Sequence, residues 1–153
     1  MLNERERFCL EQAYNQAVLA YEKQEVPVGA IVVHEQTIVA AAHNLRETTF
    51  NPLAHAELLA LTQTAQSLQR WRLTGCTLFV TLEPCPMCAG ALVNARIDRV
   101  IFAARDPKAG ACGSLMNIAS DPRLNHRVEV IEYLEDEKFG ELLSKFFREK
   151  RCN

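Results

Sequence analysis

Four residues in the middle of the chain carry side chains that could hold a metal ion and move protons: His55, Glu57, Cys85 and Cys88. One imidazole and two thiolates are ligand types of zinc, and three protein ligands leave the fourth tetrahedral position open for water. The carboxylate of Glu57 is then free to transfer protons between that water and a substrate. The pattern predicts a catalytic zinc site with one ion per chain.

The spacing of these residues follows from helix geometry. Cys85 and Cys88 are three residues apart, so we expect them on one face of a helix introduced by Pro84, where unpaired N–H groups favour thiolates. His55 and Glu57 are two residues apart and would point to opposite sides of a regular helix. His55 is therefore expected at the very start of its helix, where the backbone is not yet regular.

Two competing interpretations use the same residues. A structural zinc site would be closed by a fourth Cys or His. The remaining histidines are isolated from any CxxC or HxxxH partner: His34, His43 and His126. A redox CxxC pair beside an incidental HAE sequence would instead predict a dithiol that oxidises and no metal in the purified protein.

Composition indicates an ordinary globular chain. Its 153 residues are 48% hydrophobic and 24% charged, which predicts a single domain, 1–153, with a sizeable core. The N-terminus carries charges of both signs and no apolar run, so we expect neither a signal peptide nor a membrane segment, and a cytoplasmic location. In that compartment the six cysteines stay reduced.

The net charge of −2 conceals a segregation of charge along the chain. Residues 129–141 hold six acids against one lysine. Residues 144–153 hold Lys145, Arg148, Lys150 and Arg151 against one acid, and residues 96–127 also have an excess of basic residues. A local basic surface is possible despite the acidic total, although such charge runs are often only solvated faces.

Hydrophobic patterning predicts alternating strands and helices around these motifs. A first helix at 4–23 is predicted to bury Phe8, Ala13, Ala17, Leu19 and Ala20, and strands at 28–33 and 38–42 are predicted to form a hairpin covered on both faces. A helix from His55 to 68, a strand at 77–81, the cysteine helix to 94 and a strand at 100–103 follow. The chain is then predicted to form one helical turn at 114–118, a strand at 128–131 and a helix at 136–150 that buries Phe139, Leu142, Leu143 and Phe146. The strand–helix–strand run at 77–103 implies a parallel pair. Both zinc-bearing turns should therefore lie near one edge of the sheet.

The order H-x-E followed by P-C-x-x-C is the known signature of zinc-dependent nucleobase deaminases. The chain resembles the cytidine deaminase-like superfamily at these residues, and within it the bacterial tRNA-specific adenosine deaminases. The resemblance covers nearly the whole chain through EVPVGAIVV (25–33), HNLR (43–46), AHAE (54–57), VTLEPCPMCAGAL (80–92), AARD (103–106), Gly110, GSLMN (113–117), NHRVE (125–129) and SKFFR (144–148). The zinc motif alone marks only the superfamily, because guanine and cytosine deaminases often share Pro-Cys-Pro-Met-Cys.

The resemblance implies a three-layer α/β/α fold of the cytidine deaminase-like type with a five-stranded mixed sheet. It also implies a homodimer that converts adenosine to inosine at the wobble position of a tRNA anticodon. His55, Cys85 and Cys88 correspond to the zinc ligands, and Glu57 corresponds to the proton shuttle.

The same resemblance implies a set of substrate contacts. Asn44 would hydrogen-bond the flipped base, and the residues lining its pocket would be Val28, Ala56 and Phe147. The resemblance also favours Arg105 and Asp106 as substrate contacts. Independently, the basic segments are expected to contact RNA phosphates through Arg105 and Lys108 on the loop after Ala104 and through Lys145, Arg148, Lys150 and Arg151 on the final helix. Three positions have simpler interpretations without a substrate: Asn44 could be no more than a turn residue that ends a strand, Phe147 could be a core residue, and Arg105 could pair with Asp106.

Three functions are compatible with these motifs. The first is the RNA-editing enzyme, the second a small-molecule deaminase acting on guanine, cytosine or cytidine, and the third a zinc-stabilised RNA-binding protein without activity. Glu57 argues against the third, because a binding module gains nothing from a carboxylate beside an open zinc position. A homodimer is also expected, because the helices at 55–68 and 85–94 carry more apolar residues than one sheet face can cover. These residues are Leu58, Leu59, Leu61, Ala89, Ala91, Leu92 and Val93.

Overall fold

A five-stranded mixed sheet lies at the centre of the computed structural model, which describes residues 1–152. Asn153, the last residue of the predicted domain, lies outside the described residues. The elements in chain order are α1 (Glu4–Glu22), β1 (Gly29–His34), β2 (Thr37–His43), α2 (Ala56–Leu68), β3 (Cys76–Val80), α3 (Pro86–Asn94), β4 (Arg99–Phe102), β5 (Glu129–Glu132) and α4 (Lys138–Cys152).

The strands lie in the order β2-β1-β3-β4-β5. β1 pairs antiparallel with both β2 and β3, whereas β3–β4 and β4–β5 are parallel. The predicted hairpin, the parallel pair and the five-stranded mixed sheet are thus confirmed. The hairpin turn has only two residues, Glu35 and Gln36, and both have the positive φ angles that match the twist of such a tight connection.

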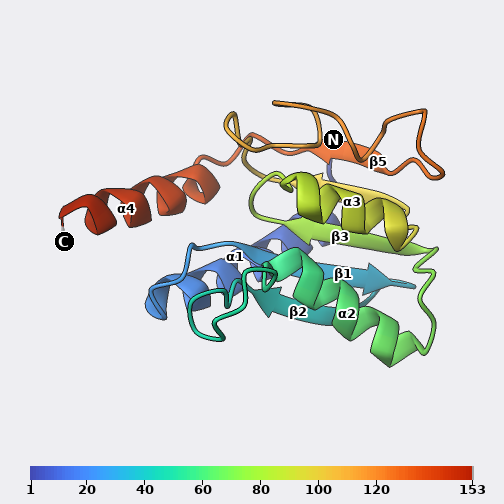
Figure 1. The fold of residues 1–153 in the computed structure, drawn as a ribbon, viewed down its shortest axis with the longest axis horizontal. Coiled ribbons are helices and arrows are strands. Elements are labelled where there is room, and N and C mark those ends of the chain that lie inside the picture. Colours follow the sequence, from blue (N-terminus) through green and yellow to red (C-terminus); the bar gives the residue numbers. More distant parts are fainter. Residues whose placement is uncertain (153) are drawn as a thin grey trace.

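Helices cover the two faces of the sheet and make three layers (Figure 1). Side chains alternate along β3, so that Leu78 and Val80 face the core beneath α2 and α3 while Phe79 faces α1. Gly29 on β1 is in direct contact with α1, because a Cβ there would overlap the backbone at Ala13 and Ala17. Small residues on both elements therefore set how closely α1 approaches the sheet.

Two predicted burial patterns are wrong. Phe8 and Leu19 of α1 are 56% and 41% exposed, because the face against the sheet is the one that carries the small residues. Strand β2 is covered fully on one face only. Ala40 and Ala42 pack in the core below α2, whereas Ala41 is exposed, since β2 is the edge strand and α1 lies mainly over β1.

The C-terminal part also differs from prediction in detail. No helical turn forms at 114–118; instead Cys112 and Asn117 form an isolated bridge within a loop. Helix α4 projects beyond one end of the sheet (Figure 1) and packs on α1 through two edge-to-face aromatic pairs, Tyr14 with Phe139 and Tyr21 with Phe146. Leu142, predicted to be buried, is only half-buried. Within residues 1–152, no helix is long and apolar enough to cross a membrane.

Candidate active site

The N-terminal ends of α2 and α3 bring the predicted zinc ligands together. His55 is the N-cap of α2 with extended backbone (φ −74°, ψ 147°), as its spacing from Glu57 required. Cys85 is likewise the N-cap of α3, with Pro86 at the first helical position. The helix therefore begins at Pro86 and not at Pro84 as predicted, so Cys85 lies just outside it and Cys88 lies in its first turn.

The three ligand atoms are spaced for one tetrahedral ion. The Nδ1 atom of His55 lies 3.7 Å from Cys85 Sγ and 3.5 Å from Cys88 Sγ. A tetrahedral zinc with Zn–S near 2.3 Å and Zn–N near 2.0–2.1 Å separates N from S by about 3.5 Å. All three atoms lie within 4.8 Å of one another, and no other such group occurs in residues 1–152. Two thiolates and one imidazole therefore form a site suited to one zinc ion.

Electrostatics within this group favour one thiolate before any ion binds. The pKa of Cys85 falls to about 4, because the Cys88 side chain, His55 and the Cys88 backbone N–H all stabilise its thiolate. The pKa of Cys88 is raised by the neighbouring Cys85 and by burial. The pKa of His55 is raised, chiefly by its hydrogen bond with Cys85. Metal binding must therefore displace the proton of Cys88, and the raised pKa of His55 makes protons compete with the metal for its Nδ1.

Glu57 lies in the first turn of α2 beside the three ligands but is not one of them. Its side chain is almost fully buried, with the residue 4% exposed. Burial raises the pKa of this carboxyl group, because the charged form loses its hydration, although His55 opposes the shift. A carboxyl group that is easily protonated and shielded from bulk water is suited to hold and transfer a proton.

A small cavity of about 180 Å³ opens directly above these groups. It is lined by Val28, Asn44 and Ala56, the positions predicted to surround the base, together with His55 and Glu57. Asn44 is buried, and its Oδ1 accepts a hydrogen bond from the Arg46 backbone N–H (3.0 Å). Asn44 thus shapes the end of β2 and also lines the pocket.

A wider groove of about 1040 Å³ adjoins the pocket and shares part of its wall. Its lining is rich in basic side chains, namely Arg46, Lys108, Arg148, Lys150 and Arg151. Phe147 lies in this groove and not in the inner pocket, where it was expected; its ring packs edge-on against Phe146 and remains 45% exposed. The reason is that α4 flanks the groove from outside the three layers.

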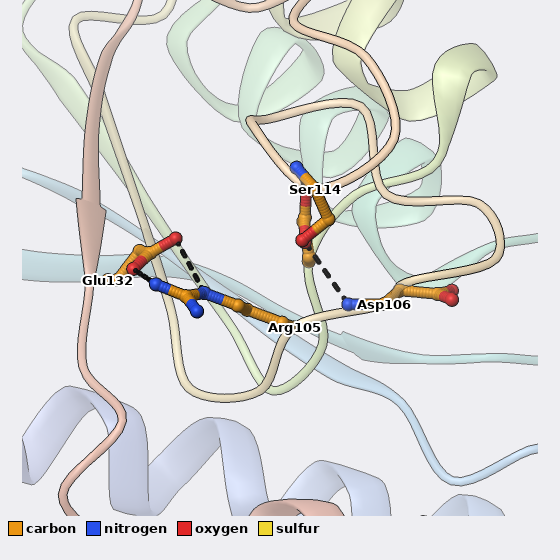
Figure 2. Close-up of polar contacts among 5 residues, drawn as sticks. Arg105, Asp106, Ser114 and Glu132 are labelled. Atoms are coloured by element: carbon orange, nitrogen blue, oxygen red, sulfur yellow. Dashed lines mark hydrogen bonds and ion pairs between the residues drawn. The ribbon is translucent and has the colours of Figure 1, made fainter.

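Arg105 lies outside both cavities. Its guanidinium donates to both carboxylate oxygens of Glu132, at 3.1 and 2.7 Å, and points away from Asp106 (Figure 2). The two loop neighbours therefore do not pair with each other. Asp106 lines the pocket, and its Oδ1 accepts hydrogen bonds from the backbone N–H groups of Lys108 and Ala109, at 3.1 Å each. Strand β5 decides the partner of Arg105 by bringing Glu132 beside it.

The other histidines are placed away from the ligands. His43 is the last residue of β2, and its ring contacts α1 and the residue after it, with Nδ1 3.0 Å from Gln16 Oε1 and Nε2 3.0 Å from Lys23 Nζ. Burial and the lysine lower its pKa, so the neutral ring donates to Gln16 and accepts from Lys23. His34 contacts Arg70, and His126 donates to the Ile97 carbonyl oxygen.

Sequence reasoning missed two buried carboxylates and one arginine at the site. Glu25 and Glu83 are 0% and 2% exposed and accept hydrogen bonds from loops that flank the pocket. The sequence feature that could have identified them as buried is an acidic residue among apolar and proline residues, in EVPVG for Glu25 and in LEPC for Glu83. Arg46 lines both cavities, and a basic residue two positions after Asn44 was the available clue.

Comparisons with known proteins agree with this geometry. The MafB19-like deaminase family matches residues 4–151. The chain is 50% identical over 142 residues to the tRNA-specific adenosine deaminase of Bacillus subtilis, covering 93% of this chain and 88% of that protein. It is 49% identical over 146 residues to the one from Aquifex aeolicus, covering 95% and 96%.

Solved structures give the same picture. A tRNA:A34 deaminase studied for A-to-I editing at the wobble position superposes with a TM-score of 0.85 at 36% identity, over 89% of this chain and 99% of the other. Guanine deaminase from Bacillus subtilis superposes less closely, with a TM-score of 0.65 at 26% identity over 99% and 96% of the two chains.

Proposed function

The chain belongs to the MafB19-like deaminases and, among them, to the tRNA-specific adenosine deaminases, and on this premise we propose that it converts adenosine to inosine at the wobble position of a tRNA anticodon. The observation that carries the proposal is the convergence of His55, Cys85 and Cys88 with the buried Glu57 on the floor of a small cavity. Its 180 Å³ is well below the ~300–1,000 Å³ of pockets for drug-sized ligands. The cavity thus suits one heterocycle, with sugar and phosphates outside.

The proposed reaction replaces the C6 amino group of adenine with oxygen from water and releases ammonia. Zinc held by His55, Cys85 and Cys88 would supply an activated water molecule. We assign Glu57 as the proton shuttle, which takes a proton from the water and passes protons to the ring nitrogen and the departing amine. The buried position and raised pKa of Glu57 support this role, because its carboxyl group takes up a proton readily and is shielded from bulk water.

We also assign the pocket residues. Asn44 would hydrogen-bond the flipped base, and Val28 and Ala56 would contact its faces and edges. Asp106 and Lys108, on the loop that closes one side, would contact the neighbouring nucleotide or its backbone. Arg46 stands at the boundary of pocket and groove, and we add it to this set.

The anticodon stem-loop is proposed to occupy the wider groove. Arg148, Lys150 and Arg151 line that groove from α4 and are placed to meet phosphates, while Phe147 offers an exposed ring on which a base could stack. Splaying an unpaired loop adenine costs only stacking energy, a few kcal/mol. Phosphate contacts in the groove would offset that cost. Arg105 is left out of the assignment to RNA contacts, because Glu132 engages its guanidinium.

A homodimer in the cytoplasm completes the proposal. Four of the apolar residues expected at the interface are instead buried in the single chain, where they pack against the sheet: Leu61, Ala89, Leu92 and Val93. Leu58, Leu59 and Ala91, on α2 and α3, stay only half-buried and leave apolar surface for a second copy. The cytoplasm keeps the thiols of Cys85 and Cys88 reduced and contains the proposed substrate. Light scattering should return about twice the 17.2 kDa of one chain at micromolar concentration, and a monomer mass would contradict the dimer.

One incubation series tests the function. The purified, zinc-loaded protein is mixed separately with an anticodon stem-loop carrying adenosine at the wobble position, with guanine, with cytosine and with cytidine, and ammonia and inosine are measured. We expect inosine in the stem-loop and little ammonia from the free bases. Ammonia from a free base with an unchanged stem-loop would identify a small-molecule deaminase instead.

A further inference from the structure

Glu83 is a buried carboxylate that the reaction described above does not use. It lies on the linker between β3 and α3, two residues before Cys85, and is 2% exposed. In residues 1–152 no lysine or arginine lies within ion-pair distance of it. A buried charge without a counter-ion is costly unless hydrogen bonds satisfy it.

Those hydrogen bonds all come from one loop, residues 106–114. The backbone N–H of Asp106 donates to Oε1 (3.1 Å), and the N–H groups of Cys112 and Ser114 donate to Oε2 (3.0 Å each). The Ser114 hydroxyl also donates to Oε1. In Figure 2 Ser114 and the Asp106 backbone nitrogen lie close to each other, whereas the Arg105 side chain points the other way, toward Glu132. Four donors separated by up to eight residues thus converge on one carboxylate.

The loop wraps closely around this group. A Cβ added at Gly110 would overlap the Glu83 carboxyl carbon and Oε2, so a glycine is needed where the loop passes over the charge. The Ala111 N–H donates to the Pro84 carbonyl oxygen (2.9 Å), and the Glu83 N–H donates to the Ala104 carbonyl oxygen (2.8 Å). The loop is therefore tied to the linker that leads into the cysteine helix.

This loop contributes to both cavities. Asp106 and Ala109 line the inner pocket, and Lys108 lines the groove. Within the loop, Asp106 closes a turn, because its Oδ1 accepts from the Lys108 and Ala109 N–H groups and its carbonyl oxygen accepts from the Gly110 N–H. The hydrogen bonds to Glu83 and to the Pro84 carbonyl oxygen hold that turn against the linker before α3, so the position of the loop at the pocket entrance depends on them.

The charge on Glu83 is needed for all four bonds. Four donors and no acceptor face its two oxygens, and the ionised carboxylate is the form that accepts from all of them. An amide in its place would present one acceptor oxygen and one NH₂ group. The NH₂ group would then face N–H donors that have no other partner.

We propose that Glu83 is a positioning residue for substrate binding: its buried carboxylate holds the 106–114 loop in the shape that receives RNA, and thereby sets KM and not the chemical step. The proposal rests on the proposed function, since it takes the loop to be an RNA contact. Glu83 is not one of the converging metal ligands, and although it also lines the inner pocket, its carboxylate is occupied by the loop, so it acts through Asp106, Lys108 and Ala109.

The test compares Glu83→Gln with Ser114→Ala, which removes one donor and leaves the charge with three. Each zinc-loaded protein is assayed for zinc content, for kcat and KM on the anticodon stem-loop, and for hydrogen exchange of the Asp106 and Cys112 amides. Leu10→Ala, a buried change on α1, is the control for lost stability alone. For Glu83→Gln we expect one zinc, kcat within about threefold of the parent and KM raised about tenfold or more, with faster exchange in the loop. Ser114→Ala should show a smaller shift of the same kind.

Three results would overturn the proposal. They are loss of zinc or of kcat with KM unchanged, a KM no higher than in Leu10→Ala, and unaltered exchange in the loop. Should Glu83→Gln fail to fold, Ser114→Ala decides by the same readouts, since unchanged exchange and KM in that variant refute the positioning role. Failure of the proposed function gives a different result. If the parent protein leaves the stem-loop unedited, the proposed function is refuted, and the exchange measurement still shows whether Glu83 holds the loop.

Discussion

Replacing Glu57 with glutamine removes proton transfer while preserving shape. The amide has the same size as the carboxyl group but can neither accept the proton of water nor deliver it. A positioned general acid–base residue is worth about 10²–10⁴ in rate, which is about 2.7–5.5 kcal/mol at 1.36 kcal/mol per tenfold. Because the residue is only 4% exposed, bulk water cannot replace it, and we expect a loss at the upper end of that range.

Single-turnover deamination of an anticodon stem-loop, read as inosine formed, measures this loss, and elemental analysis measures the metal. Glu57→Gln should keep one zinc per chain, since Glu57 is not among the three converging ligands. Glu135→Gln, an exposed change of the same chemistry, should behave as the parent. Near-parental turnover in Glu57→Gln would assign proton transfer to another residue, and loss of zinc would assign Glu57 to the metal.

The same pair of proteins tests the raised pKa of Glu57. In metal-free protein, burial places the folded-state pKa above the ordinary value of 4.5, so the folded state holds more protons than the unfolded state. Stability contributed by the protonated form is therefore complete below about pH 4.5 and is lost as pH rises through the folded-state pKa. Glu57→Gln lacks that loss. After chelation, the Tm of the variant relative to the parent should rise between pH 4 and 8, and a constant difference would refute the pKa direction.

Three further predictions concern the ligands and the groove. The parent should contain one equivalent of zinc, whereas Cys88→Ala should hold far less and be inactive; Cys152→Ala, an exposed thiol on α4, should match the parent. Because the pKa values of Cys88 and His55 are raised, zinc binding at pH 7 should release about one to two protons. Calorimetry in buffers of different ionisation enthalpy measures this number, and a release near zero would contradict the raised pKa values. Lys150→Glu with Arg151→Glu should raise KM for the stem-loop at moderate salt and lower the salt dependence of binding, and the milder pair of Gln substitutions should do so less; an unchanged KM would show that the basic end of α4 is only a solvated surface.

Local sequence signals account for most of the elements. The hairpin, the parallel strands and the helices were predicted to within a few residues, because periodicity and caps depend on neighbours only a few positions apart. The exposed face of β2 was not predicted, because a run of consecutive apolar residues is compatible both with a central strand and with an edge strand. The position of α1 over β1 decides that Ala41 stays uncovered.

The zinc group was predictable because its parts are local and their order is a known signature. His55 and Cys85 are each placed by the first turn of a helix, and the Cys85–Cys88 spacing is one such turn; the meeting of His55 with the two cysteines, 30 residues later, followed from the H-x-E and P-C-x-x-C signature. The substrate wall was not readable in this way. Arg105 pairs with Glu132, 27 residues later, through a strand pairing that no local pattern encodes.

By itself, then, the sequence determined which residues can bind zinc and move protons, and that they lie at helix starts beside a mixed sheet. Only the tertiary structure decided that Phe147 lines the outer groove, that Arg105 is already paired, and that Glu83 holds the loop at the pocket. The physical reason is the range of the interactions. Caps and ligand spacings follow from a few consecutive dihedral angles. A loop side chain can instead pair with several distant groups, each hydrogen bond contributes only about 0.5–3 kcal/mol, and the packed fold determines which pair forms.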